Sequence, residues 1–213
     1  MKIVAVCVSA TAHIFPGSLP FVNRVNAMPA PPRRSTARVA FVAEERNRAV
    51  QQALDRHPDL THILMLDSWY LENPANDHEW NRFIKAYDDP ETILGASTYQ
   101  VHDTRLFAEP ITFFVEIATV LEAADSTMGV EGKTGRIRVQ AVGSIYIFPI
   151  WAWKTRHYEA RKDYFLPEHV DLCRSSGYPV YLSFDHRFYK KPVRYGVWKK
   201  LRVAAGYELN RLK

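Results

Sequence analysis

An aspartate, Asp67, directly follows the apolar run Thr61–Leu66, a place where a carboxylate contributes nothing to packing. In an α/β sheet, ligands bind at the carboxyl ends of the strands. A carboxylate there can accept hydrogen bonds from a ribose or ligate a cation. The alternative is a helix N-cap or Asx-turn aspartate, which is common where a strand ends.

A second acidic cluster opens an expected helix much later in the chain, in Glu168-His-Val-Asp-Leu-Cys173. Glu168 and Asp171 are three residues apart and therefore share one face of the first turn. Such carboxylates can act as general bases, and so can the imidazole of His169. Acidic residues are also stabilised at any helix N-terminus by the helix dipole, so an ordinary helix start explains them equally well.

Gly143 and Arg46 are two further candidates. Gly143 precedes the apolar strand Ser144–Phe148, which indicates either that the backbone approaches a ligand closely or that the strand contains a bulge. Arg46 lies on an expected helix, where its guanidinium can bind a phosphate in two-pronged fashion. A solvated helix face is the alternative for Arg46.

The 213 residues are enough for one sizeable α/β domain. The composition, 47% hydrophobic and 24% charged, excludes a disordered or fibrous chain, and two cysteines exclude a disulfide scaffold. No apolar run reaches the roughly 18 residues that a membrane-spanning helix needs. The segment from Met1 to Ala12 imitates a short signal peptide, but its β-branched run at 3–8 favours a buried strand.

Periodicity and turn residues predict alternating strands and helices. Proline-rich sequence from 10 to 35 is expected to be irregular, and the segment from Pro110 to Gly135 is ambiguous. The expected strands are 3–8, 61–66, 92–98, 136–148 (broken at Gly143) and 178–184, and the expected helices are 36–55, 76–87 and 168–176. This alternation predicts an α/β fold with a mostly parallel twisted sheet flanked by helices. Residues 1–190 would form a single domain and 191–213 a basic C-terminal helix or tail.

The order of these pieces resembles the nucleotide-sugar glycosyltransferases of the GT-A fold, family-2-like, and is similar to the small stand-alone type of archaeal viruses and phages. The resemblance spans about residues 1–190. It is carried by Arg46-Asn47-Arg-Ala49-Val-Gln-Gln-Ala53-Leu54, His62-Ile-Leu-Met-Leu-Asp67-Ser68-Trp69, Gly95 with Tyr99, Val142-Gly143 through Phe148, Glu168 through Cys173, and Gly177-Tyr178-Pro-Val180.

The resemblance implies transfer of a sugar from a nucleoside-diphosphate donor to an acceptor hydroxyl, with inversion expected. Asp67 would match the first acid of Asp-x-Asp, near the ribose and a divalent cation (Mn or Mg), and His186 would complete the metal site. Catalytic-base candidates are Asp171, Glu168 and His169. The nucleotide-sugar site would contain Ser9, Ala10, Thr11, Arg46, Asp67 and Gly143.

Two departures from the family pattern matter. Trp69 stands where the second acid of Asp-x-Asp is expected, so either Glu72 or Asp77 substitutes, or the metal is weakly held or absent. Without a metal, the charge on the departing diphosphate must be met by Arg33, Arg34 or Lys190. His169 stands where an aspartate is usual, which favours Asp171 or Glu168 as the base.

The positive charge is concentrated at the C-terminus. Residues 186–213 contain nine Lys or Arg and a single acid, whereas the first 185 contain 19 basic and 22 acidic residues. An amphipathic helix over 197–213 would pack on the domain with a solvated basic face, lie on an anionic membrane, or hold nucleic acid. The expected location is cytoplasmic, or the host cytoplasm for a viral protein. The basic tail adds peripheral membrane association as one option.

Several alternatives remain open. The acceptor would be a glycan, a lipid-linked sugar, a protein or a modified DNA base, the last as in phage DNA-modifying transferases. A non-catalytic nucleotide- or glycan-binding protein on a degenerate GT-A scaffold would also explain Trp69 and His169. A nucleotidyltransferase is disfavoured because no glycine-rich loop follows the first expected strand.

Overall fold

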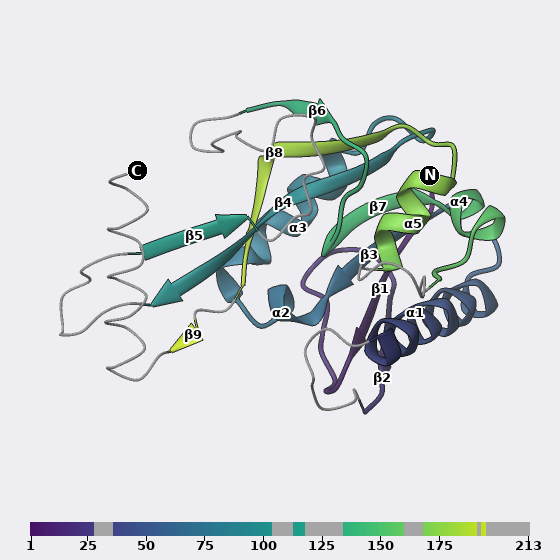
Figure 1. Cartoon of the computed structure of the whole chain (residues 1–213), viewed down its shortest axis with the longest axis horizontal. Coiled ribbons are helices and arrows are strands. Elements are labelled where there is room, and N and C mark those ends of the chain that lie inside the picture. Colours follow the sequence, from purple (N-terminus) through teal and green to yellow (C-terminus); the bar gives the residue numbers. More distant parts are fainter. Residues whose placement is uncertain (28–35, 104–112, 118–133, 160–167, 191–192, 195–213) are drawn as a thin grey trace.

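A computed structural model describes residues 1–27, 36–103, 113–117, 134–159, 168–190 and 193–194 (Figure 1). In this part the chain forms a sheet with helices on both faces, an α/β fold as predicted. Its strands are β1 (Ile3–Ser9), β2 (Phe21–Val25), β3 (His62–Asp67), β4 (Ile93–Asp103), β5 (Phe113–Ile117), β6 (Arg136–Arg138), β7 (Ile145–Pro149), β8 (Val180–Tyr189) and β9 (Val193–Arg194). Its helices are α1 (Thr36–Arg56), α2 (Ser68–Leu71), the 3₁₀ turn η1 (Pro74–Asn76), α3 (Asp77–Ala86), α4 (Ile150–Thr155) and α5 (Glu168–Ser175).

The sheet is mixed, which corrects the expectation of a mostly parallel one. Its order is β2-β1-β3-β7-β4-β8-β6, with β5 and β9 pairing to β4 outside this path. β1 is parallel to β2 and β3, and β4 is parallel to β8 and β9, but the other four pairings are antiparallel. The expectation was wrong because β7 lies antiparallel between β3 and β4, which a simple crossover connection would have made neighbours.

One edge of the sheet collects the ends that matter for function. β1 and β3 end there, and β8 ends there too because β3, β4 and β8 all run in the same direction. β7 runs the opposite way and begins at this edge, where the Asp67 amide donates to the Ser144 carbonyl at 2.9 Å. We call this the carboxyl edge and define it by Ser9, Asp67 and Ser144.

The core is split between the two faces of the sheet. α1, α4 and α5 cover one face, which we call the α1 face, and α2 and α3 cover the other, the α3 face. In Figure 1, α1 and α5 stand in front of the sheet and α3 lies behind β4. Ile63 and Met65 of β3 point to the α1 face, whereas Leu64 and Leu66 point to the α3 face. Because side chains alternate along a strand, Asp67 follows Ile63 and Met65 onto the α1 face.

Several elements lie close to their predicted positions. The run at 3–8 is strand β1, whose seven residues are all buried between the edge strand β2 and β3. The helices predicted over 36–55, 76–87 and 168–176 are α1, α3 and α5. Gly177 has a φ of 81°, the left-handed conformation that favours glycine just after a helix end.

Other elements differ from the prediction. β2 lies within the proline-rich stretch that was expected to be irregular; it follows Pro20 and is an edge strand, where prolines flanking the strand disturb no central ladder. The single broken strand predicted over 136–148 is two strands far apart in the sheet, β6 and β7. β5 pairs with the last residues of β4, and both extend beyond the other strands at the left of Figure 1.

Most of the ambiguous segment 110–135 and the predicted tail helix over 197–213 lie outside the described residues. Residues 193–194 form β9, which pairs with the end of β4. No helix among the described residues has the length and apolar character needed to cross a bilayer.

Candidate functional site

Asp67 is held by an arginine and not by the helix that it precedes. It occupies the N-cap position of α2, yet its side chain makes no capping hydrogen bond. Its Oδ1 instead accepts a hydrogen bond from Nη2 of Arg46 at 2.6 Å, and the side chain remains 31% exposed. The capping alternative therefore does not explain this aspartate, which is free of α2 and partly open to solvent.

Arg46 is buried on the apolar face of α1, with Ala49, Val50 and Ala53 at helical spacing beside it. Besides Asp67, its Nη1 donates to the hydroxyl of Tyr146 in β7 at 3.3 Å. A buried guanidinium needs a carboxylate to offset its desolvation, and Asp67 is that partner. Arg46 is 5% exposed and supports Asp67 from behind, and its predicted contact with a phosphate stays a prediction.

Gly143 is required by a histidine. A Cβ added at Gly143 would lie 2.2 Å from Nε2 of His169, so the imidazole occupies the space of the missing side chain. The next residue, Ser144, has a φ of 65°, a backbone conformation that residues other than glycine seldom adopt. Strained backbone of this kind often accompanies functional sites. The close neighbour of Gly143 in this structure is the imidazole of His169, whereas the approach of a ligand to Gly143 stays a prediction.

Replacing Gly143 by alanine is expected to displace the His169 ring and to destabilise the fold by about 1–3 kcal/mol, the usual cost of overpacking. Denaturant unfolding measures the loss. Gly135→Ala is a comparison in which backbone strain at a positive φ is the only cost, because nothing lies within 4 Å of a Cβ there, so His169→Ala should not rescue it. Adding His169→Ala should restore stability to Gly143→Ala. Absence of any rescue would show that the clash lies elsewhere.

α5 brings His169, which lies between the two acids of the second cluster, to the same place. His169 packs on Gly143 and lies 6.1 Å, between ring centroids, from Tyr146. Asp171 is 8% exposed, and its Oδ1 accepts a 3.5 Å hydrogen bond from Ser175. The side chain of Glu168 lies outside the described part. A continuous path of contacts, Asp67 to Ser144, Gly143 and then His169, joins the two segments that the sequence singled out.

The end of β1 contributes polar residues to the carboxyl edge. Ser9 follows Val8, the register partner of Asp67, and its buried hydroxyl has two acceptors within reach of its single proton, Asn23 Oδ1 at 3.2 Å and the Thr11 carbonyl. Ala10 and Thr11 are exposed. The structure thus puts all three predicted base-contacting residues at the carboxyl edge.

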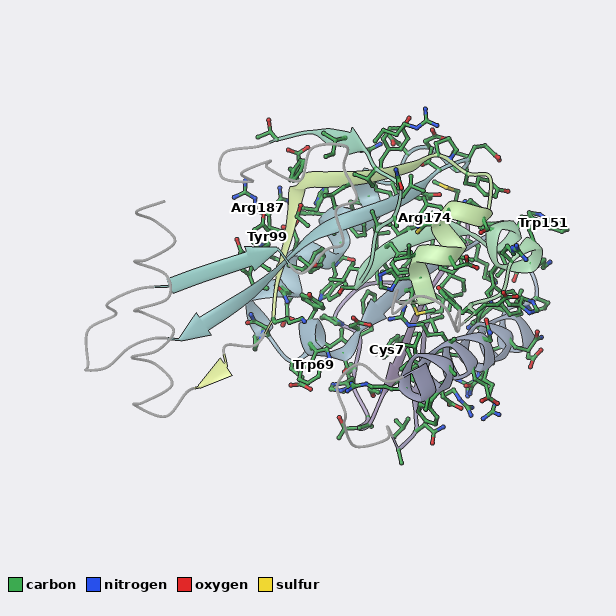
Figure 2. The ribbon with its side chains drawn as sticks, in the orientation of Figure 1. Cys7, Trp69, Tyr99, Trp151, Arg174 and Arg187 are labelled. Atoms are coloured by element: carbon green, nitrogen blue, oxygen red, sulfur yellow. The ribbon has the colours of Figure 1, made fainter. Side chains whose placement is uncertain are left out.

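His186 and Trp69 bear on the predicted cation. His186 lies against α3, where its Nδ1 is 2.6 Å from Oε1 of the buried Glu79, so it is on the opposite face from Asp67. Trp69 is an exposed residue of α2 (Figure 2), and its indole cannot bind a metal ion. The part of the chain described here contains no group of three His, Cys, Asp or Glu side chains suited to a metal ion. Asp67 and His186 therefore do not fit a shared cation, and Asp67 already has a cationic partner.

Lys190 is a cation that does lie at the carboxyl edge. It follows β8, its amide donates to the Tyr99 carbonyl at 2.8 Å, and its Nζ lies 5.8 Å from the centroid of the Tyr70 ring. Tyr70 belongs to α2, which begins directly after Asp67, and its ring is buried in the cluster on the α3 face. The alternative that assigns the diphosphate charge to Lys190 is compatible with this position. Arg33 and Arg34 lie outside the described residues.

Cys7 is close to this site but cannot serve as a nucleophile. Burial, and then the nearby Asp67 carboxylate, raise the pKa of the Cys7 thiol far above its usual value. The reactive thiolate is therefore absent at physiological pH. Cys7 lies in the interior of the molecule (Figure 2), in the cluster on the α3 face of the sheet.

Sequence reasoning missed Tyr146 and Tyr158, which contact Arg46. The Tyr146 hydroxyl is 2.7 Å from that of Tyr158, and the Arg46 guanidinium lies 5.7 Å from the Tyr158 ring centroid. Tyr146 is the one residue with a polar side chain in the apolar strand β7. A buried tyrosine hydroxyl usually has a hydrogen-bond partner, so its presence there indicates a buried polar group nearby. Tyr158 carries no local signal, because its role depends on a distant helix.

No family model and no curated protein sequence matches this chain. Among solved structures, A197 from STIV is similar at 14% identity and a TM-score of 0.42, over 92% of this chain and 98% of that one. A glycosyltransferase involved in the glycosylation of the major capsid of PBCV-1 is similar at 13% identity and a TM-score of 0.39, over 79% of this chain and 73% of that one. At these identities and TM-scores, neither structure assigns an activity to this chain.

Proposed function

We propose that this chain is a GT-A-like glycosyltransferase that moves a sugar from a nucleoside-diphosphate donor to an acceptor hydroxyl. The observation that carries the proposal is the arrangement around Asp67. A partly exposed carboxylate stands at the carboxyl edge, backed by a buried arginine, with the end of β1 in the neighbouring strand and Ser144, next to the Gly143–His169 contact, bonded to its amide. Carboxyl ends of strands are where α/β sheets bind nucleotides.

In the proposed complex, the nucleoside lies over the ends of β1 and β3, with the base near Ser9–Thr11. Oδ1 of Asp67 is engaged by Arg46, so Oδ2 is the oxygen that accepts a hydrogen bond from a ribose hydroxyl. Binding the donor by its nucleoside fixes the anomeric carbon for attack, and fixed geometry accounts for much of an enzyme's rate enhancement.

The chemical step is a displacement at the anomeric carbon. A carboxylate of α5, Asp171 or Glu168, accepts the proton of the acceptor hydroxyl as its oxygen forms the new glycosidic bond. The bond from the anomeric carbon to the diphosphate oxygen breaks, and the electron pair leaves with the nucleoside diphosphate. Attack from the face opposite the leaving group inverts the anomeric configuration.

The charge that develops on the leaving diphosphate needs a positive partner. The residues predicted to hold a divalent cation do not meet in this fold, so no step is assigned to a metal. We assign this role to Lys190, which stands beside Tyr70 at the carboxyl edge. In this proposal the site binds its donor through hydrogen bonds to Asp67 and through a fixed side-chain cation.

The experiment that tests the function is release of nucleoside diphosphate from a panel of UDP-, GDP-, CDP- and dTDP-sugars by the purified chain, with and without excess EDTA. Release from at least one donor that survives EDTA supports both the activity and the role of Lys190. Release abolished by EDTA would overturn the metal-free version. Tight binding of a donor without release would favour the non-catalytic binding protein, and no binding at all would refute the proposed function.

A further inference from the structure

Four side chains from distant parts of the sequence form one hydrogen-bonded chain that ends at Asp67. The Tyr158 and Tyr146 hydroxyls are 2.7 Å apart, Tyr146 accepts from Arg46 Nη1 at 3.3 Å, and Arg46 Nη2 donates to Asp67 at 2.6 Å. Tyr146 and Tyr158 are almost completely buried. None of the sequence motifs predicted this series of hydrogen bonds, and the proposed reaction does not use the two tyrosines directly.

The far end of the chain is fixed by Asn47, the neighbour of Arg46 on α1. Asn47 Oδ1 accepts from the Tyr158 amide at 2.9 Å and from the Trp153 indole at 2.8 Å. Its Nδ2 donates to the Tyr158 carbonyl at 2.9 Å. Two of these hydrogen bonds therefore hold the backbone of Tyr158 to the helical turn that carries Arg46, and the third holds Trp153 to the same turn.

The direction of the hydrogen bonds from Arg46 follows from its chemistry. A guanidinium has donors and no acceptor, so the Tyr146 oxygen accepts from Arg46, and either hydroxyl can donate in the hydrogen bond between Tyr146 and Tyr158. Burial raises the pKa of the Tyr146 hydroxyl well above its ordinary value, and Tyr158 raises it further. The hydroxyl therefore keeps its proton at physiological pH. A planar guanidinium bound at two of its nitrogens has one orientation, which directs Nη2 at Asp67.

We propose that Tyr158 and Tyr146 are positioning residues that hold Arg46 and, through it, set the rotamer of the Asp67 carboxylate that receives the donor nucleoside. This inference rests on the proposed function, and it adds a specific consequence. Removal of one buried hydroxyl that touches no substrate should weaken donor binding and leave the chemical step little changed.

The first test is Tyr158→Phe, which keeps the ring over Arg46 and deletes only the hydroxyl. The dissociation constant for the tightest-binding member of a UDP, GDP, CDP and dTDP panel is expected to rise at least about fivefold, with a parallel rise in the donor KM and little change in kcat. Tyr146→Phe should do the same. An unchanged dissociation constant in both variants would overturn the proposal.

Tyr87→Phe is the matched control. Its hydroxyl is also buried and donates to the Thr92 carbonyl at 2.8 Å, but Tyr87 belongs to the cluster on the α3 face. This variant should lose stability as Tyr158→Phe does while binding nucleoside diphosphate as the wild type does. If Tyr87→Phe weakens binding equally, the effect of Tyr158→Phe is a general loss of stability and the positioning role is wrong.

A second test needs no ligand and so separates the inference from the proposed function. Tyr158→Phe and Asp67→Asn are compared singly and together by denaturant unfolding. We call the hydrogen-bonded series Tyr158–Tyr146–Arg46–Asp67 the relay. If it couples Tyr158 to Asp67, the unfolding equilibrium constant of the double variant should differ at least about threefold from the value obtained by multiplying the two single effects, as coupled side chains do. Independent effects would overturn the relay whatever the nucleotide data show. Coupling in a protein that binds no nucleoside diphosphate would refute the proposed function and leave the relay in place.

Discussion

Asp67→Asn is expected to lower kcat/KM for sugar transfer at least about 100-fold, because the amide cannot receive the ribose hydroxyl with the same charge and orientation. The same substitution removes the negative partner of the buried Arg46. We therefore expect a loss of stability as well, of about 1–3 kcal/mol, the usual contribution of a hydrogen bond to a charged group. Steady-state kinetics and denaturant unfolding measure the two effects separately.

Glu79→Gln provides the comparison for Asp67→Asn. Glu79 is a buried carboxylate that pairs with His186 at 2.6 Å and with Arg82 at 2.9 Å, on the α3 face. Its substitution should also cost stability, but it should leave sugar transfer unchanged at temperatures where the variant is folded. Equal losses of activity in the two variants would mean that Asp67 acts through stability alone.

Asp171→Asn is expected to lower kcat by about 10²- to 10⁴-fold while leaving donor affinity close to that of the wild type. A general base contributes about this factor, and an amide cannot accept the proton of the acceptor hydroxyl. Glu168→Gln, made in parallel, tests the neighbouring carboxylate on the same helix. Pre-steady-state kinetics and equilibrium binding separate the chemical step from donor binding.

Asp185→Asn is the acid-to-amide control for this pair of variants. Asp185 is exposed in β8 and accepts a hydrogen bond from the Gly135 amide at 2.9 Å. It should retain full turnover. If both α5 variants also retain turnover, the base does not come from α5, and the assignment made for the acidic cluster is wrong.

The secondary structure could be predicted where local patterns determine it. The β-branched run of β1 and the period of α1 and α3 were sufficient, and Gly177 marked the end of α5. The direction of β7 could not be predicted, because a fully buried strand such as Ile145–Pro149 has the same pattern in parallel and antiparallel sheets. The position of β7 between β3 and β4 is set by tertiary packing, and its antiparallel direction makes the sheet mixed.

The candidate site could be predicted only in part, for similar reasons. Asp67, Gly143 and His169 were recognisable because each has a residue type that is unusual for its position. The burial of Arg46 could have been predicted, because Arg46 lies on the apolar face of α1 and its guanidinium therefore points inward.

His186 could not be placed from sequence. The register between β4 and β8 shifts, so that Ala96 pairs with Ser183 and the next residue, Ser97, pairs with Arg187. Extra residues in one strand change which face each later side chain takes. His186 therefore packs against Phe83 and Glu79 on the α3 face, away from Asp67.

The most direct measurement is a crystal structure of the chain bound to the nucleoside diphosphate that it binds most tightly. The account predicts ribose hydroxyls within hydrogen-bonding distance of Oδ2 of Asp67, with the Arg46 contact to Oδ1 intact and the diphosphate facing Lys190. A nucleotide bound on the α3 face beside His186, or anywhere that leaves the Asp67 carboxylate without a contact, would contradict it.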